Sequence, residues 1–206
     1  MSSEVGMKVN ENSSHFLIRR IHSLMGLLPI GIFLTFHLCL NLSARFGPET
    51  YDKVIAFMQS IPGIFLIEVV VIFIPIAFHA IYGTYVVYTG QSNVLRYRYV
   101  RNWLYIIQRI SGIVTVLFVV YHVVLIRFGD ASFAGMQGSV STPIGFIFNL
   151  LGIILSIFHF TNGLWAFAIT WGITVGPRAQ KIWTYVCGVI FVLMSIIGTL
   201  AITAFM

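Results

Sequence analysis

Charged side chains are scarce in this sequence. Of its 206 residues, 12 are Lys or Arg and 6 are Asp or Glu, whereas 58% are hydrophobic. About a quarter of the residues in a typical soluble domain are charged, so the composition excludes an ordinary soluble protein and indicates a membrane protein. The net charge of +6 comes from basic residues between apolar segments. That placement is typical of membrane topology and not of a nucleic-acid-binding surface.

Cysteine is also scarce, and the common cofactor motifs are missing. The two cysteines, Cys39 and Cys187, both lie in apolar runs, and the sequence has neither a CxxC nor a GxGxxG motif. This excludes a cysteine-bound iron–sulfur cluster, a zinc finger or a dinucleotide-binding fingerprint in this chain. We interpret both cysteines as small buried hydrophobic residues.

The most prominent feature of the sequence is a set of long apolar segments. A helix needs about 20 apolar residues to cross a bilayer, and five segments are long enough. They cover residues 21–42, 63–88, 103–126, 143–171 and 182–205. The sequence therefore predicts an all-α integral membrane protein, a five-helix bundle forming one transmembrane domain over residues 1–206. The intervening residues 43–61, 89–102, 127–142 and 172–181 are predicted to be loops.

The basic residues predict the orientation of the bundle. The N-terminal segment, the second-to-third loop and the fourth-to-fifth loop together carry eight Lys or Arg residues, against three on the other side. Cytoplasmic loops carry the excess of positive charge, so we expect a cytoplasmic N-terminus and an external C-terminus. Pro29 and Pro75 lie inside predicted helices, where proline favours a kink. Pro75 precedes a histidine by four residues and would help to set its direction.

Each of the first four apolar segments contains one well-placed histidine. These are His37, His79, His122 and His159. Each lies 15–19 residues after the start of its segment, which is roughly 22–28 Å along a helix. Because consecutive helices are antiparallel, His37 and His122 are expected toward the outside, and His79 and His159 toward the cytoplasm. Ionisable groups inside a membrane are costly, which marks these residues as a candidate functional site.

Two histidines at one depth on facing helices suit a haem whose iron takes an imidazole on each face. The pattern of glycines supports this interpretation, because a flat macrocycle needs room beside its ligands. Gly83 and Gly163 lie four residues after His79 and His159, on the same helix face. Gly26 and Gly112 lie 11 and 10 residues before the other two histidines, about three turns away and near the level of the inner pair.

The same four histidines are also compatible with other roles. A single membrane histidine is often only a hydrogen-bonding link between helices. A proton-relay carrier would be expected to have acids inside the membrane, and Glu68, near one segment end, is the single such acid. A zinc site is disfavoured because the four histidines lie at two separate depths. His15 and His22 are interpreted as interfacial residues at the cytoplasmic edge.

Haem propionates are anions that need cationic or hydroxyl partners near the membrane surface. Membrane topology alone would also explain each basic residue that could serve. The candidates are Arg19, Arg20, Ser23, Arg109 and Arg178 on the cytoplasmic side, and Arg45 and Arg127 outside.

Several motifs in fixed order resemble one family. They are RRIHSLMG, FHLCLN, FHAIYG, RNWLYIIQRISG, YHVV, FHFTNGLW and WGITVGPRAQK. From about Phe16 to its end, the chain resembles the di-haem cytochrome b membrane anchors of bacterial succinate:menaquinone reductases, which are related to the anchors of quinol:fumarate reductases.

The resemblance implies a subunit of the bacterial cytoplasmic membrane that docks a flavoprotein and an iron–sulfur subunit on its cytoplasmic face. It implies two b haems, the outer bound by His37 and His122 and the cytoplasm-side haem by His79 and His159. Electrons from succinate would pass to menaquinone. The chain would belong to an oxidoreductase as its quinone-reactive subunit, without a succinate site of its own.

Quinone reduction also consumes protons, and Glu68 is the candidate for exchanging them. Asn41, Ser43, Arg45 and Tyr51 are further candidates near a quinone head group. The sequence departs from some fumarate reductase anchors, which have a glutamate just before the fourth ligand; here Ile157 and Phe158 precede His159. The alternatives are a haem b anchor of another membrane dehydrogenase and a proton-coupled carrier with a histidine relay.

Overall fold

The computed structural model describes residues 2–92 and 94–206, and the side chains from His15 onward. Every regular element in the described residues is helical. The α-helices are α1 (Ser2–Leu27), α2 (Pro29–Asn41), α3 (Pro48–Ser60), α4 (Ile64–Glu68), α5 (Ile74–Thr89), α6 (Val100–His122), α7 (Phe133–Val140), α8 (Pro143–Thr170) and α9 (Pro177–Thr203). The 3₁₀-helix η1 (Leu42–Phe46) and the π-helical segments η2 (Val69–Phe73) and η3 (Val123–Arg127) connect some of them.

Within residues 2–92 and 94–206, five continuous helical stretches are long and apolar enough to cross a membrane, as the sequence predicts. They are His15–Phe46, Ile64–Thr89, Val100–Arg127, Pro143–Thr170 and Pro177–Thr203. The last stretch begins five residues before the predicted start at residue 182. Pro177 occupies the first turn of α9, where a missing backbone N–H costs nothing.

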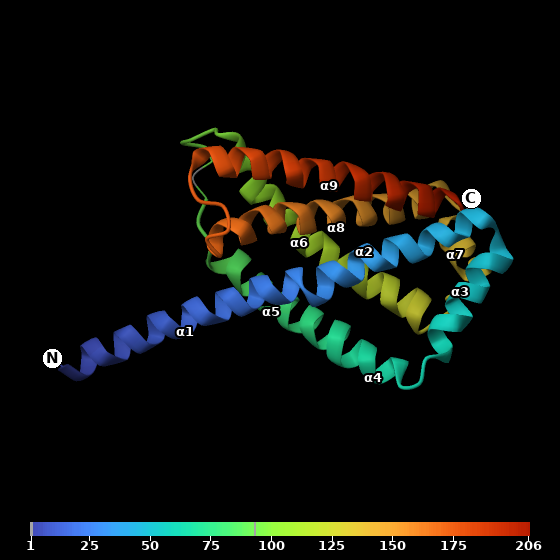
Figure 1. Ribbon diagram of the computed structural model, residues 1–206, viewed down its shortest axis with the longest axis horizontal. Helices are drawn as coiled ribbons and strands as arrows, with labels where there is room; N and C mark the ends of the chain where they lie inside the picture. The colour runs from blue at the N-terminus through green and yellow to red at the C-terminus, as the bar shows by residue number, and fades with distance from the viewer. Residues whose placement is uncertain (1, 93) are drawn as a thin grey trace.

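The five spans form one elongated bundle, with α1 and the C-terminus at opposite ends of its long axis (Figure 1). Helix α8 is central: it packs against α6 on one side and α9 on the other. Helix α1 packs against α5 and α8, and α2 against α9. Gly152 faces the ring of Phe118, and Gly198 faces Ile153. Small residues at these contacts let the helices approach closely, which is how membrane helices gain packing energy.

The helix assignment changes next to each of the two prolines that are predicted to favour a kink, Pro29 and Pro75. Leu28 interrupts the first span between α1 and α2, directly before Pro29. In the second span, the π-helical η2 ends two residues before Pro75. Proline cannot donate to the preceding turn. The ladder widens to π-helical spacing before Pro75, whereas around Pro29 it keeps its α-helical spacing, with Leu28 N bonded to Leu24 O (2.9 Å) and Ile32 N to Leu28 O (3.2 Å).

The prediction that residues 43–61 and 127–142 are plain loops is wrong, because they contain α3 and α7. Both helices lie at the end of the bundle near the C-terminus (Figure 1). The Ser132 side chain caps α7 by accepting a hydrogen bond from Gly135 N (3.2 Å). The two helices cover the bundle end with a buried cluster. It comprises Ala44, Tyr51, Met136, Val140, Ile202 and Phe205.

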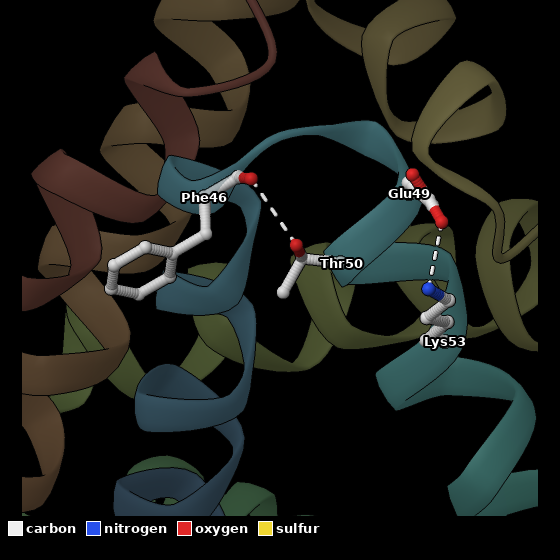
Figure 2. Close-up of polar contacts among 4 residues, drawn as sticks. All are labelled: Phe46, Glu49, Thr50 and Lys53. Carbon is white, nitrogen blue, oxygen red and sulfur yellow. Dashed lines mark hydrogen bonds and ion pairs between the residues drawn. The ribbon is translucent and has the colours of Figure 1, made fainter.

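Figure 2 shows the polar contacts at the start of α3. Thr50 Oγ1 donates to the Phe46 carbonyl (3.2 Å), and Lys53 Nζ lies 2.7 Å from Glu49 Oε1. The Lys53 and Glu49 side chains are 73% and 83% exposed, and such a pair contributes only about 0.3–0.5 kcal/mol. Burial of the apolar cluster, and not this ion pair, therefore holds α3 on the bundle.

Candidate functional site

The structure brings the four histidines together in the two pairs that the helix depths predict. The ring centroids of His37 and His122 are 5.7 Å apart, with the ring planes at 84°. Those of His79 and His159 are 6.1 Å apart, at 85°. That either pair binds iron stays a prediction.

The spacing of each pair fits two ligands of one iron. With metal–imidazole bonds of about 2 Å, two rings on opposite sides of one metal have centroids roughly 6 Å apart. Among the described residues, no three or more His, Cys, Asp or Glu side chains form a group that would hold a metal ion. Two protein ligands per site suit an iron whose other four positions are filled by a porphyrin.

His79 and His159 have their imidazole tautomers fixed by backbone carbonyls. Nδ1 of His79 lies 2.9 Å from the carbonyl oxygen of His22, and Nδ1 of His159 lies 3.0 Å from that of Gln108. A carbonyl oxygen can only accept, so each Nδ1 carries the proton and each Nε2 keeps its lone pair. This is the arrangement that orients metal-ligating histidines.

The same local construction holds both of these histidines. On α1, Gly26 lies one turn after His22, and a Cβ at Gly26 would be 2.5 Å from the His79 ring. On α6, Gly112 lies one turn after Gln108, and a Cβ there would be 2.8 Å from the His159 ring. A carbonyl at one position and a glycine four residues later thus form a notch for the ring.

The glycines that follow the ligands by one turn complete this construction. Gly83 faces His22, because its Cβ would lie 3.2 Å from His22 Nε2, and Gly163 faces the Gln108 side chain at 3.5 Å. Gln108 Nε2 also donates to the His159 carbonyl (3.0 Å). His22 and Gln108 belong to this site, although neither is among the haem-site residues that the sequence predicts. The sequence signal that would identify them is their position four residues, or one helical turn, before Gly26 and Gly112.

His37 differs from the inner pair in its partners. Asn41, one turn later on α2, places Nδ2 3.3 Å from His37 Nε2, and Tyr51 OH donates to Asn41 Oδ1 at 3.5 Å. Tyr51 is only 2% exposed, and its burial, with the nearby Asp52 charge, raises its pKa to about 12. A series of hydrogen bonds therefore links helix α3, which covers this end of the bundle, to the outer histidine pair.

The basic residues on the inner side have different surroundings. Arg109 lies over the Tyr105 ring at 4.1 Å, and its guanidinium donates to the Val86 carbonyl (3.3 Å) near the end of α5. Carbonyls at a helix C-terminus carry partial negative charge. This charge accounts for the position of the Arg109 guanidinium without a haem propionate. Arg19 and Arg178 are exposed.

Arg20 and Ser23 form a small cluster with Trp171. The Arg20 guanidinium lies 4.9 Å from the Trp171 ring centroid, and Trp171 Nε1 donates to Ser23 Oγ (3.1 Å). Arg20 Nε and Tyr82 OH are buried, and neither has a partner among the described residues. Buried polar groups are usually hydrogen-bonded, so this end of the bundle fits a group with an anionic edge, such as a haem with its propionates.

On the other side, Arg127 forms an ion pair with Glu68. Its Nε and terminal nitrogen lie 2.9 and 2.7 Å from Glu68 Oε2. Glu68 ends α4 immediately before η2, and Arg127 ends η3. The contact joins the residue before η2 to the last residue of η3, and π-helical segments occur frequently at functional sites. Arg45 instead donates to Thr203 Oγ1 (3.3 Å), and Ser43 Oγ is buried without a partner among the described residues.

Comparison with known proteins points to one family. The family described as "Succinate dehydrogenase/Fumarate reductase transmembrane subunit" matches residues 88–198, more than half of the chain. The chain is also 45% identical, over 195 residues, to the succinate dehydrogenase cytochrome b558 subunit of Bacillus subtilis (strain 168). That alignment covers 92% of this chain and 96% of the relative.

Proposed function

Because the chain belongs to the succinate dehydrogenase/fumarate reductase transmembrane subunit family, we propose that it is the membrane-anchoring cytochrome b subunit of such a complex. In this role it carries electrons from an iron–sulfur subunit to menaquinone. A flavoprotein and the iron–sulfur subunit dock on its cytoplasmic face. The complex lies in the bacterial cytoplasmic membrane.

The pairing of four membrane histidines supports two b haems. His79 and His159 hold the cytoplasm-side haem, and His37 and His122 hold the outer one. The distances between ring centroids, 6.1 Å for His79 and His159 and 5.7 Å for His37 and His122, suit one iron per pair. When bound, each haem supplies a one-electron carrier. The chain itself fixes the inner ligands through the two carbonyl-and-glycine notches on α1 and α6.

We place the quinone site near the outer pair. Quinone reduction needs a group that moves protons, and Glu68 is a part-buried acid whose charge is balanced by Arg127 at 2.7 Å. Asn41 and Tyr51, joined to His37 by hydrogen bonds, provide polar contacts for a quinone head group. In this arrangement Arg127 positions the Glu68 carboxylate.

The decisive experiment is a haem count on the purified membrane complex. Pyridine haemochrome analysis should give about two haems b per chain, and succinate should reduce one population in a reduced-minus-oxidised spectrum. His37→Ala and His159→Ala should each remove one haem, while the exposed His15→Ala should remove none.

Two other outcomes would redirect the assignment. No haem at all, with substrate flux in liposomes, would favour the histidine-relay carrier. Two haems in a complex that co-purifies with hydrogenase or formate dehydrogenase subunits would favour an anchor of another dehydrogenase.

A further inference from the structure

The side chain of His22 has no role in the function proposed above, although it lies in direct contact with His79. The two imidazole rings are stacked, with centroids 4.1 Å apart and planes within 7° of parallel. The backbone carbonyl of the same residue holds His79 Nδ1. His22 therefore contacts this histidine both at its edge and on its ring face.

These two contacts restrain different motions of the His79 ring. The hydrogen bond to the carbonyl fixes which nitrogen faces away from α1, but a single hydrogen bond leaves the ring free to turn about it. A parallel ring on one face opposes that turning. Gly26 lets the His79 ring approach α1. A Cβ at this position would lie 2.5 Å from His79 Cε1 and would block that approach.

Comparison with the other inner histidine isolates the contribution of the stacked ring. Gln108 occupies the place of His22 in the second notch, and its side chain is anchored by hydrogen bonds to the His159 carbonyl (3.0 Å) and from Asn162 (2.9 Å). The His22 side chain has its Nε2 buried without a partner among the described residues. Its side chain contacts the site through its ring face, which is stacked on His79.

We propose that His22 is a positioning residue whose imidazole, stacked on His79, fixes the plane of that iron ligand at its near-perpendicular angle to His159. This inference rests on the proposed function, since it requires His79 and His159 to bind one haem. Residues that orient metal ligands tune both the spectrum and the redox potential of the metal. His22 would then set these properties for one haem of the two.

The test compares three variants of the purified complex. His22→Ala removes the ring, His22→Phe keeps a flat ring but removes both nitrogens, and the exposed His15→Ala is the control on the same helix. The readouts are haem content, the EPR spectrum of the ferric haems and the midpoint potential of each haem. In a ferric bis-imidazole haem the largest g value is highest when the ring planes are perpendicular.

We expect His22→Ala to move the largest g value of one haem to a lower value and to shift the midpoint potential of that haem alone. His22→Phe should stay close to the unmodified protein in both measurements, and His15→Ala should match it. Loss of one haem in His22→Ala but not in His22→Phe would support the same conclusion, because the stacked ring would then be needed to hold the ligand.

Three results would overturn the inference. The first is an unchanged spectrum and potential in His22→Ala, and the second is His22→Phe behaving like His22→Ala. The third is loss of a haem from both, since His22→Phe retains a ring to stack. All three are distinct from failure of the proposed function, which would appear as a lack of haem in the unmodified complex.

Discussion

At the scale of single residues, the inner site depends on the absence of a side chain at two glycines, Gly26 and Gly112. Gly26 and Gly112 are not needed for a special backbone conformation, because both lie within regular helix. They are needed because the rings of His79 and His159 occupy the space in which a side chain would lie. The carbonyl one turn earlier can reach each ring only at this close approach.

Gly26→Ala and Gly112→Ala should therefore each disturb one histidine ligand. The added Cβ would lie 2.5 Å from the His79 ring or 2.8 Å from the His159 ring, so the ring must move off its carbonyl. We expect haem content to fall from two to one per chain, measured by pyridine haemochrome. Gly188→Ala is the matched control, because no atom lies within 4 Å of its Cβ position. Full haem content in both test variants would contradict the inference that Gly26 and Gly112 make room for the two histidine ligands.

Glu68 is tested by a change of charge without a change of shape. Glu68→Gln keeps the size of the side chain but cannot accept and release a proton. We expect quinone reductase activity to fall roughly a hundredfold, a typical effect of losing a general acid–base group, with haem content unchanged. Glu49→Gln is the control, since Glu49 is an exposed acid paired with Lys53. Unchanged quinone reduction by Glu68→Gln would remove Glu68 from the mechanism.

At the scale of elements, α3 and α7 show how two short helices close one end of the bundle. Tyr51 is the centre of their contact, because its ring packs edge-on against Phe205 (5.1 Å) and Phe133 (6.1 Å). Its hydroxyl reaches Asn41, and Asn41 reaches His37. The cap is thus connected to the outer histidine pair as well as to the apolar cluster.

The burial of Tyr51 predicts a specific loss of stability in alkali. Its pKa is raised from 10.0 to about 12 in the folded protein. Below pH 10 the phenol is neutral in both states, so this residue adds no pH dependence. Between pH 10 and about 12 the unfolded chain ionises first, and stability falls with rising pH. Two pKa units correspond to about 3 kcal/mol.

The measurement compares thermal unfolding of the unmodified protein with Tyr51→Phe on both sides of that pH window. Tyr51→Phe loses only a long hydrogen bond, so it should be slightly less stable below pH 10. Above pH 10 it should lose less stability than the unmodified protein, and the difference between the two should shrink or reverse. A constant difference across the window would show that Tyr51 ionises equally in both states.

At the scale of the whole molecule, the bundle has two unlike ends. Five spans place α1 and the C-terminus at opposite ends (Figure 1). One end contains the Arg20 and Trp171 cluster and the His79–His159 pair. The other contains the α3 and α7 cap and the His37–His122 pair. Which end faces the cytoplasm is predicted by the distribution of Lys and Arg alone.

The orientation can be measured with a reporter fused to the C-terminus. We expect alkaline phosphatase in this position to be active and a fluorescent protein that folds only in the cytoplasm to be dark. A fusion in the loop after α8 should give the opposite result. Matching results from both fusions would indicate a different number of spans, and exchanged results would place the N-terminus outside.

The sequence by itself determined the number of spans and the grouping of the histidines. Both follow from one-dimensional regularities: bilayer thickness fixes the length of an apolar segment, and helix rise converts the position of a histidine into a depth. Antiparallel connection of successive spans then groups His37 with His122 and His79 with His159.

The tertiary structure alone decided what surrounds each ring. The place of His22 near the end of a segment predicts an interfacial residue, whereas packing of α1 on α5 stacks its ring against His79. The α3 and α7 helices were missed because their apolar residues become a core only when the C-terminal end of α9 lies beneath them. Contacts of this kind depend on the rotation of one helix against another, which the spacing of residues along a single segment does not specify.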